Sequence, residues 1–294
     1  MTLKNVIFLI LFLITFSCSD KNESADDSSY SVWTQVGNGL SADVTKNVLT
    51  EFVGSTNCPV CPASDSLLLS YFNDGHENYV GAEITQNWFL LNYHTYSPSR
   101  GDPMYEFLRG ESEEDDYCYV RFGDGYGTGA WYNVGGVPTV YTNGLNSFIN
   151  PGMAITPMAE STPIQMSLSG TEFDGANISV KLSIKTSTDL SANDSLCLFI
   201  AAKIDDVDYE GYNNEKHHQD VFLGWINEGF NGELLTLGHE EVVKNYAFEM
   251  ASNWPQNDYE TSWSEVEYDL ANLAVVAFIQ NKYTREILQV VGTD

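Results

Sequence analysis

The chain has 294 residues, a formal net charge of −28 at pH 7 and hydrophobic residues at 43% of its positions. So negative a charge argues against nucleic acid and anionic lipid as partners, because phosphate groups would be repelled. The length is more typical of two domains than of one. The hydrophobic content is sufficient for each domain to have a core of its own.

The N-terminus has the pattern of an export signal. Lys4 precedes an apolar run, Val6 to Ile14, that is too short to span a bilayer. Ser17 followed by Cys18 resembles a lipoprotein signal, in which the cysteine is lipidated and becomes the first residue. The two residues before Ser17 depart from that pattern, and a plain secretory signal is the alternative. We therefore expect a signal peptide at 1–17 and lipidation at Cys18.

Residues 18–39 are expected to form a flexible tether after the lipid anchor. The stretch "SDKNESADDSS" is polar and acidic and has no apolar period. Ser19 after the cysteine and the acidic start of the tether resemble lipoproteins that are sent to the outer membrane. The sequence thus predicts an outer-membrane lipoprotein that faces the periplasm or the cell surface.

The elements that follow predict an α/β first domain over 40–160. "KNVLTEFVGS" has the pattern of a strand, "PASDSLLLSYF" that of a helix, and "NWFLLNYHTY" that of a buried central strand. Residues 97–133 are too many for a bare loop, so they should contain helices or have a function. Asn143-Gly144 lies between two short strand patterns and predicts a hairpin.

From about Pro163 the pattern changes to strands with few helices. "ANISVKLSIKT" alternates apolar and polar residues, and five further strand patterns follow. The last two meet in "FIQNKYTREILQVV", which predicts a closing hairpin. Such a series indicates an all-β second domain, an Ig-like antiparallel sandwich over 161–294.

Cys58 and Cys61 form a Cys-x-x-Cys pair between the first strand and the first helix. This is the thioredoxin arrangement. The first cysteine is then exposed at a helix N-terminus, where free amides and the helix dipole favour a thiolate. We expect Cys58 to be the nucleophile and Cys61 the resolving thiol. A zinc site would need two more ligands at suitable spacing, and the sequence shows none, so neither a metal nor a cofactor is expected.

Val137 and Pro138, in "GGVPTV", are the second part of the predicted site. Thioredoxin-like folds place a cis-proline against the disulfide, and the backbone of the preceding residue receives the substrate strand. We therefore expect Val137 and Pro138 to bind substrate. A trans proline in a turn is the alternative.

Three segments, "VLTEFVGSTNCPVCPASDSLL", "GGVPTVYTNG" and "VVAFIQNKYTREILQV", resemble the outer-membrane-protein-28-related family of bacterial lipoproteins. The resemblance implies a thioredoxin-like domain followed by a β-sandwich, with the cysteine pair at Cys58 and Cys61 and the proline at Pro138. Two departures are Asn57 before the first cysteine and one extra residue between Phe52 and Cys58. Glu51 therefore need not face the disulfide as a proton-relay acid would.

Two functions remain open for this pair. Pro59 and Val60 offer no cation to a thiolate, and the carboxylates of Glu51 and Asp65 would raise a thiol pKa. The helix N-terminus is left as the activating group, which predicts a modest nucleophile. The first function is thiol–disulfide exchange with exported protein substrates or a redox partner. The second is a surface binding or adhesion module with a structural disulfide, so whether the protein is an enzyme is left open.

Other features have weaker signals. Cys118 and Cys197 either bridge or, as the strand pattern around Cys197 indicates, are buried thiols. The acidic run at 110–119 is expected to be a solvated face, while "DDVDYEG" at 205–211 is a somewhat better calcium candidate. His217-His218 is expected on an exposed loop of the sandwich.

Three aromatic residues precede Pro138: Tyr126, Trp131 and Tyr132. They either line a peptide groove beside the disulfide or belong to ordinary packing.

Overall fold

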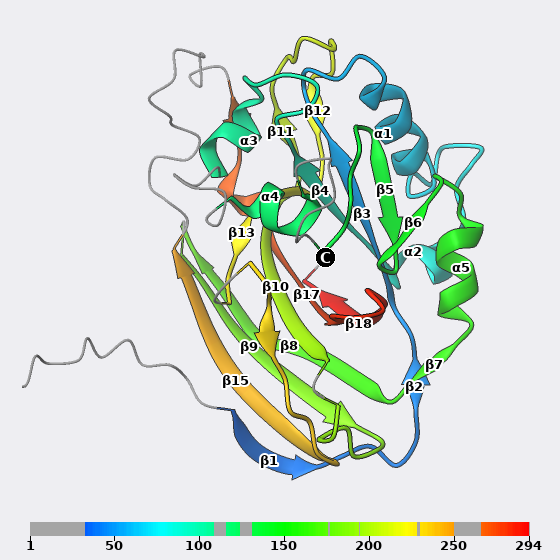
Figure 1. Cartoon of the computed structure of the whole chain (residues 1–294), viewed down its shortest axis with the longest axis vertical. Helices are drawn as coiled ribbons and strands as arrows, with labels where there is room; N and C mark the ends of the chain where they lie inside the picture. The colour runs from blue at the N-terminus through cyan, green and yellow to red at the C-terminus, as the bar shows by residue number, and fades with distance from the viewer. Residues whose placement is uncertain are drawn as a thin grey trace, which may run out of the picture. The chain divides into compact units, whose positions relative to one another are not determined.

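Figure 1 shows the computed structural model of the chain. The structure describes residues 33–108, 116–123, 131–175, 177–193, 195–227, 230–249 and 266–293, with the backbone alone at 107, 108, 119 and 146. The predicted signal peptide and Cys18 lie outside these residues. The chain is mostly β, with several sheets.

The predicted strands of the first half form one end of the largest sheet. They are β3 (Val48–Gly54), β4 (Trp88–His94), β5 (Thr139–Thr142) and β6 (Leu145–Ser147). β3 and β4 are parallel, whereas β5 is antiparallel to β3 and β6 to β5. All seven residues of β3 are buried, as expected of a strand covered on both faces. Asn143 and Gly144 have φ values of 55° and 81°, which confirms the predicted hairpin turn.

Helices cover both faces of these strands. They are α1 (Cys61–Ser70), α2 (Ala82–Thr85), α3 (Pro103–Leu108), α4 (Tyr117–Phe122) and α5 (Gly152–Met158). Leu68 of α1 and Ala154 of α5 pack with Val48 on one face, and Phe122 of α4 packs with Leu49 on the other (Figure 1). α3 and α4 lie in the 97–133 stretch, where the sequence predicted helices or a functional segment.

The predicted strands of the second half are also present. They are β8 (Ile164–Asp174), β9 (Asn177–Thr186), β10 (Leu196–Ile204), β13 (Val221–Trp225), β15 (Glu240–Glu249), β17 (Leu273–Asn281) and β18 (Ile287–Gly292). β17 and β18 form the predicted closing hairpin.

Shorter elements complete the described residues. They are β1 (Thr34–Asn38), β2 (Val44–Thr45), β7 (Ser161–Thr162), β11 (Val207–Asp208), β12 (His217–His218), β14 (Glu233–Leu234), β16 (Glu267–Tyr268) and a 3₁₀ turn at Leu270–Asn272.

Two sheets pack face to face. The smaller has the order β1-β15-β9-β8, and the larger is nine-stranded, with the order β18-β17-β10-β13-β4-β3-β5-β6 and β14 beside β10. Ile178 and Val180 of β9 pack with Leu198 of β10 and Val275 of β17 in the largest apolar cluster. Such stacking of apolar faces is typical of a sandwich.

The larger sheet joins the two halves of the chain. β13 pairs with β4 in parallel, at Val221 and Asn92, whereas the pairs between second-half strands such as β10–β17 and β9–β15 are antiparallel. Val32–Asp294 is one compact unit. The domain boundary expected between residues 160 and 161 stays a prediction, and strands from both sides of it share this sheet.

A buried ion pair lies on the α4 side of this sheet. Arg121 of α4 and Glu51 of β3 are both 0% exposed, with Nη2 and Oε1 2.6 Å apart. Tyr132 donates to Glu51 Oε2 at 2.5 Å, and Arg121 Nη2 donates to Gln280 of β17 at 3.1 Å. The guanidinium lies 4.7 Å from the ring centroid of Phe199. Groups from β3, α4, β10 and β17 thus meet at one charge pair.

Replacing Arg121→Met should destabilise the protein by about 3–5 kcal/mol, because the carboxylate of Glu51 stays buried without its charge partner. Urea denaturation followed by tryptophan fluorescence measures this free energy. Lys216→Met is the control, since Lys216 and Glu210 form a pair that is 60% and 62% exposed and such pairs contribute about 0–1 kcal/mol. Equal stability of the two variants would contradict the structural role of the buried pair.

Candidate functional site

The cysteine pair lies in the turn between β3 and α1. Cys58 and Cys61 form a disulfide with their Cα atoms 5.4 Å apart. The Cys58 amide donates to the Ser55 carbonyl at 3.0 Å, and α1 begins at Cys61. Val60 is the N-cap residue and gives no side-chain hydrogen bond. The amides of the first turn therefore remain without a side-chain cap next to the sulfur atoms.

Both cysteines are buried, each at 1% exposure, whereas Val60 between them is 60% exposed. The sequence-based expectation of an exposed Cys58 is therefore wrong. A second segment covers the sulfur: the carbonyl oxygen of Val137 lies 3.8 Å from Cys58 Sγ. The tip of the turn is in solvent and the disulfide lies beneath it.

The covering segment contains the predicted proline. The Val137–Pro138 peptide bond is cis. Gly135 and Gly136 before it are exposed, and a Cβ atom at either would meet nothing within 4 Å. The fold thus brings Cys58, Cys61 and the Val137–Pro138 peptide together, while their catalytic and substrate-binding roles stay predictions.

Trp131 and Tyr132, two of the three aromatic residues ahead of Pro138, do not line a groove. Trp131 and Tyr132 are buried and pack in the core cluster that includes Phe122 and Phe199. Tyr126 lies outside the described residues. Ordinary packing is therefore the role of Trp131 and Tyr132.

Four buried polar residues and the half-buried Glu215 gather behind the turn, and we call the five the buried polar cluster: Asp65, His94, Asp102, Glu215 and His218. His94 Nδ1 lies 2.8 Å from Asp102 Oδ2, which also accepts the Thr56 amide at 2.8 Å. The rings of His94 and His218 are 5.2 Å apart at their centroids. Sequence reasoning missed this cluster, because its members come from α1, the end of β4, the start of α3, the loop before β12 and β12 itself.

Burial and neighbouring charges perturb the titration of this cluster. Burial would lower the pKa of His94, but the Asp102 carboxylate raises it above its ordinary value. Burial would raise the pKa of Asp102, and His94 lowers it instead. Burial, with a smaller effect of Glu215, raises the pKa of Asp65 to about 7. Burial, with a smaller effect of His94, lowers the pKa of His218 to about 4.

Asp65 is the member of the cluster closest in sequence to the disulfide. It lies four residues after Cys61 on α1, and residues four apart are neighbours on a helix surface. Its carboxylate accepts no hydrogen bond from any described residue. A carboxyl group with a pKa of about 7 can both hold and release a proton at neutral pH.

The loop before β12 holds the cysteine turn from the second half of the chain. The Asn213 amide donates to the Thr56 carbonyl at 3.1 Å, and its side chain donates to the Ser55 carbonyl at 3.2 Å. A Cβ atom on Gly211 would lie 2.8 Å from the Cβ atom of Thr56, so only glycine allows this approach.

Glu51, Cys118 and Cys197 are the other residues that the sequence analysis considered. Glu51 is bound to Arg121, on the face of the sheet opposite α1. Cys118 and Cys197 are buried free thiols, which confirms the buried-thiol alternative, and burial raises the pKa of both thiols.

No family model matches the chain, and no curated protein does. Among solved structures, HBP35 of Porphyromonas gingivalis is similar, with a TM-score of 0.61 and 14% identity over 84% of this chain and 74% of that chain. A domain of the outer membrane lipoprotein Omp28 from Porphyromonas gingivalis covers 45% of this chain and 86% of its own length. Its TM-score is 0.27 at 16% identity, too low to support an argument.

The likeness to HBP35 shows a shared fold: mostly β, with several sheets. In this chain, a Cys-x-x-Cys disulfide lies at the start of a helix. Within the described residues, no helix is both long and apolar enough to cross a membrane.

Asp65→Asn should change how stability depends on pH. The pKa of Asp65 is raised from 3.8 to about 7 by folding, so the folded state binds the proton more tightly and the wild type loses stability as pH rises from 4 to 7. Asparagine does not titrate. The stability of the variant relative to wild type should therefore rise over this interval, by on the order of 2–4 kcal/mol.

Urea unfolding at a series of pH values tests this expectation. Asp74→Asn is the matched control, because Asp74 is exposed. A difference between wild type and Asp65→Asn that does not vary between pH 4 and 8 would contradict the raised pKa.

Proposed function

We propose that the chain exchanges disulfides with exported protein substrates through the Cys58–Cys61 pair. The observation that carries this proposal is the disulfide at the start of α1 with the Val137 carbonyl 3.8 Å from Cys58 Sγ. A substrate strand bound along Val137 and Pro138 would reach the sulfur that it must attack.

The topology of the first half supports a thioredoxin-like domain at 40–160. Parallel β3 and β4 are connected through α1, and β5 and β6 add antiparallel strands on the other side of β3. The face-to-face packing of β9 on β10 and β17 supports an Ig-like sandwich at 161–294. We propose that this two-part chain belongs to the outer-membrane-protein-28-related lipoproteins.

The proposed location follows from the N-terminal sequence. A signal peptide at 1–17 is removed, Cys18 is lipidated and the segment that follows tethers the folded part. The tether expected at 18–39 ends earlier than its predicted bound, because β1 (Thr34–Asn38) pairs with β15 and belongs to the fold. The protein is then an outer-membrane lipoprotein that meets its substrates in the periplasm or at the cell surface, an oxidising environment in which disulfides persist.

In the exchange reaction, a substrate thiolate attacks Cys58 Sγ and the Cys58–Cys61 bond breaks. Cys61 leaves as a thiolate, and Cys58 is now joined to the substrate in a mixed disulfide. A second substrate thiolate attacks the substrate sulfur of that mixed disulfide and releases Cys58. The substrate gains a disulfide and the protein becomes a dithiol; the reverse sequence reduces a substrate.

Asp65 has a place in this cycle. The Cys61 thiolate formed in the first step needs a proton. Asp65 lies one helical turn further along α1, and because its pKa is about 7, its carboxyl group still holds a proton below that pH. In the reverse direction the Asp65 carboxylate takes the proton of Cys61 before this sulfur attacks the mixed disulfide.

A second candidate function is a surface binding module in which the disulfide is structural. The observation in its favour is the 1% exposure of both cysteines, because exchange requires a partner thiolate to reach Cys58. In this case a protein or glycan partner binds elsewhere on the chain, and the cysteine pair closes the turn before α1.

Insulin reduction in the presence of glutathione tests the exchange reaction. We expect the full chain to accelerate it, Cys58→Ser and Cys61→Ser to abolish the acceleration, and Pro138→Ala to reduce it roughly tenfold through misplacement of the substrate. Cys118→Ser is the control, since this thiol is buried and free. A folded chain that gives no acceleration, or a Cys58→Ser variant as active as wild type, would exclude the enzyme and favour the binding module.

A further inference from the structure

Two polar segments that are separate in sequence lie on neighbouring strands. The acidic run at 205–211 contains β11, and His217-His218 is β12. The expectation of an exposed loop at these histidines was therefore wrong for His218, which is 2% exposed. β11 and β12 are antiparallel, and Asp208 lies directly opposite His217.

The alternation of the two strands fixes which side chains face solvent. Val207 and His218, a directly opposed pair, are 0% and 2% exposed. His218 Nε2 donates to the Tyr209 carbonyl at 3.1 Å. Because successive residues of a strand point to opposite faces, Asp208 and His217 point outward. The buried pair thus anchors the hairpin that presents them.

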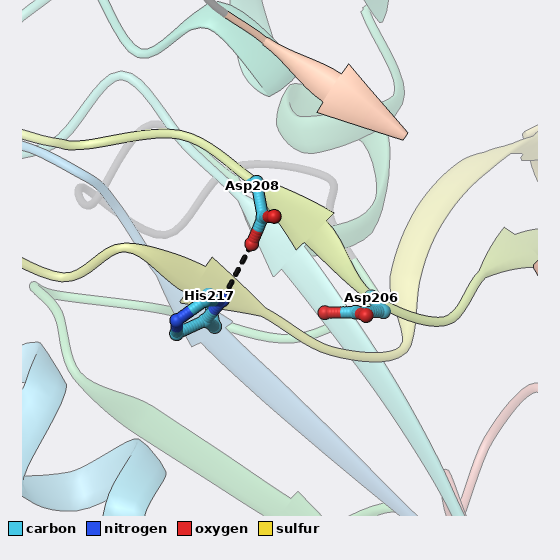
Figure 2. Close-up of side chains that lie close together, drawn as sticks. All are labelled: Asp206, Asp208 and His217. Carbon is cyan, nitrogen blue, oxygen red and sulfur yellow. Dashed lines mark hydrogen bonds and ion pairs between the residues drawn. The ribbon is translucent and has the colours of Figure 1, made fainter. Parts of the chain in front are cut away.

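A third side chain joins them. Asp206, in the turn between β10 and β11, directs its carboxylate toward His217 and Asp208 (Figure 2). The potential ligand atoms of the three residues all lie within 4.8 Å of one another. His217 Nδ1 and Asp208 Oδ1 are 2.5 Å apart. Within the described ranges, this is the one group of three or more His, Cys, Asp or Glu residues with such spacing.

The register of the neighbouring strand adds a further acidic residue. On its other side, β11 pairs with β16, and Asp208 lies directly opposite Glu267. Directly opposed residues share one face of a sheet, and like charges in that position are destabilising. His217, Asp208 and Glu267 therefore form a row across three strands in which two carboxylates repel each other. A bound cation would offset that repulsion.

We propose that Asp206, Asp208 and His217 bind a divalent first-row transition metal ion of the Zn²⁺ type. An imidazole with two carboxylates suits such ions, whereas Ca²⁺ and Mg²⁺ prefer oxygen ligands alone. Ligand atoms of a tetrahedral Zn²⁺ are about 3.3 Å apart. The three exposed side chains need only small χ rotations to reach that spacing from separations of up to 4.8 Å. Water or a group of a partner molecule fills the fourth position.

The ion would have a structural consequence of its own. It would cross-link β11, β12 and the turn before β11. The loop between these two strands contains Asn213, whose amide donates to the Thr56 carbonyl in the cysteine turn. The site does not depend on redox activity of Cys58 and Cys61, and it can be tested with the disulfide intact.

Isothermal titration of the full chain with Zn²⁺ tests the proposal. The protein carries Cys18→Ser, and its Cys58–Cys61 disulfide is kept oxidised, so that these thiols do not compete. We expect one saturable site, and a loss of affinity of roughly tenfold or more in both His217→Ala and Asp208→Asn. Millimolar Ca²⁺ should not displace Zn²⁺.

Two matched controls separate this site from general surface binding. Asp205→Asn removes the neighbouring exposed acid, and His76→Ala removes an exposed histidine elsewhere; neither should change the affinity. Titration with Co²⁺ should give visible absorption bands that are lost in His217→Ala. Weak binding at several sites that all four variants leave unchanged, or displacement of Zn²⁺ by Ca²⁺, would overturn the proposal.

Discussion

The buried ion pair between Arg121 and Glu51 is the constraint on which the rest of the arrangement depends. Both groups are fully removed from solvent, and an unpaired charge there would cost several kcal/mol. α4 brings Arg121 to the Glu51 carboxylate, and Tyr132 and Gln280 complete the hydrogen bonds around the pair. Because these partners come from both halves of the chain, the pair fixes the first-half strands against the second-half strands.

The cysteine turn directly follows the strand that contains Glu51, so the ion pair also helps to position the turn. β3 contains Glu51 and ends at Gly54, and the turn with Cys58 follows it. On the face of the sheet that α1 covers, His94 and Asp102 hold the turn through the Thr56 amide. Asn213, from the second half, holds it through the Thr56 and Ser55 carbonyls. Interactions from both halves of the chain therefore position a single disulfide.

Local patterns in the sequence were sufficient to predict the strands, helix and turn around the site. The apolar run of β4, the proline at the start of α1 and the Asn143-Gly144 turn depend on neighbouring residues alone, and each was predicted at its place. A cis peptide bond before Pro138 was one of two alternatives, the one that a thioredoxin-like fold would have. The pairing of β13 with β4 has no local signal, because it joins segments more than a hundred residues apart at Val221 and Asn92.

Residues that depend on distant contacts were the ones that sequence reasoning missed. Cys58 was expected in solvent, and the Val137 segment buries it. Asp65 was noted as an acid near the thiols, but its raised pKa arises from burial and from Glu215 of the second half. Asp208 and His217 were considered separately, because only the register of β11 and β12 places them opposite each other.

The reduction potential of the Cys58–Cys61 pair tests the central proposal most directly. Equilibration of the full chain in glutathione or dithiothreitol buffers, followed by alkylation and mass spectrometry, gives the fraction reduced. The exchange function predicts a value between roughly −120 and −270 mV, with Cys58 open to alkylation once reduced. A value below about −300 mV, with Cys58 unreactive, would mark a structural disulfide and contradict the exchange function.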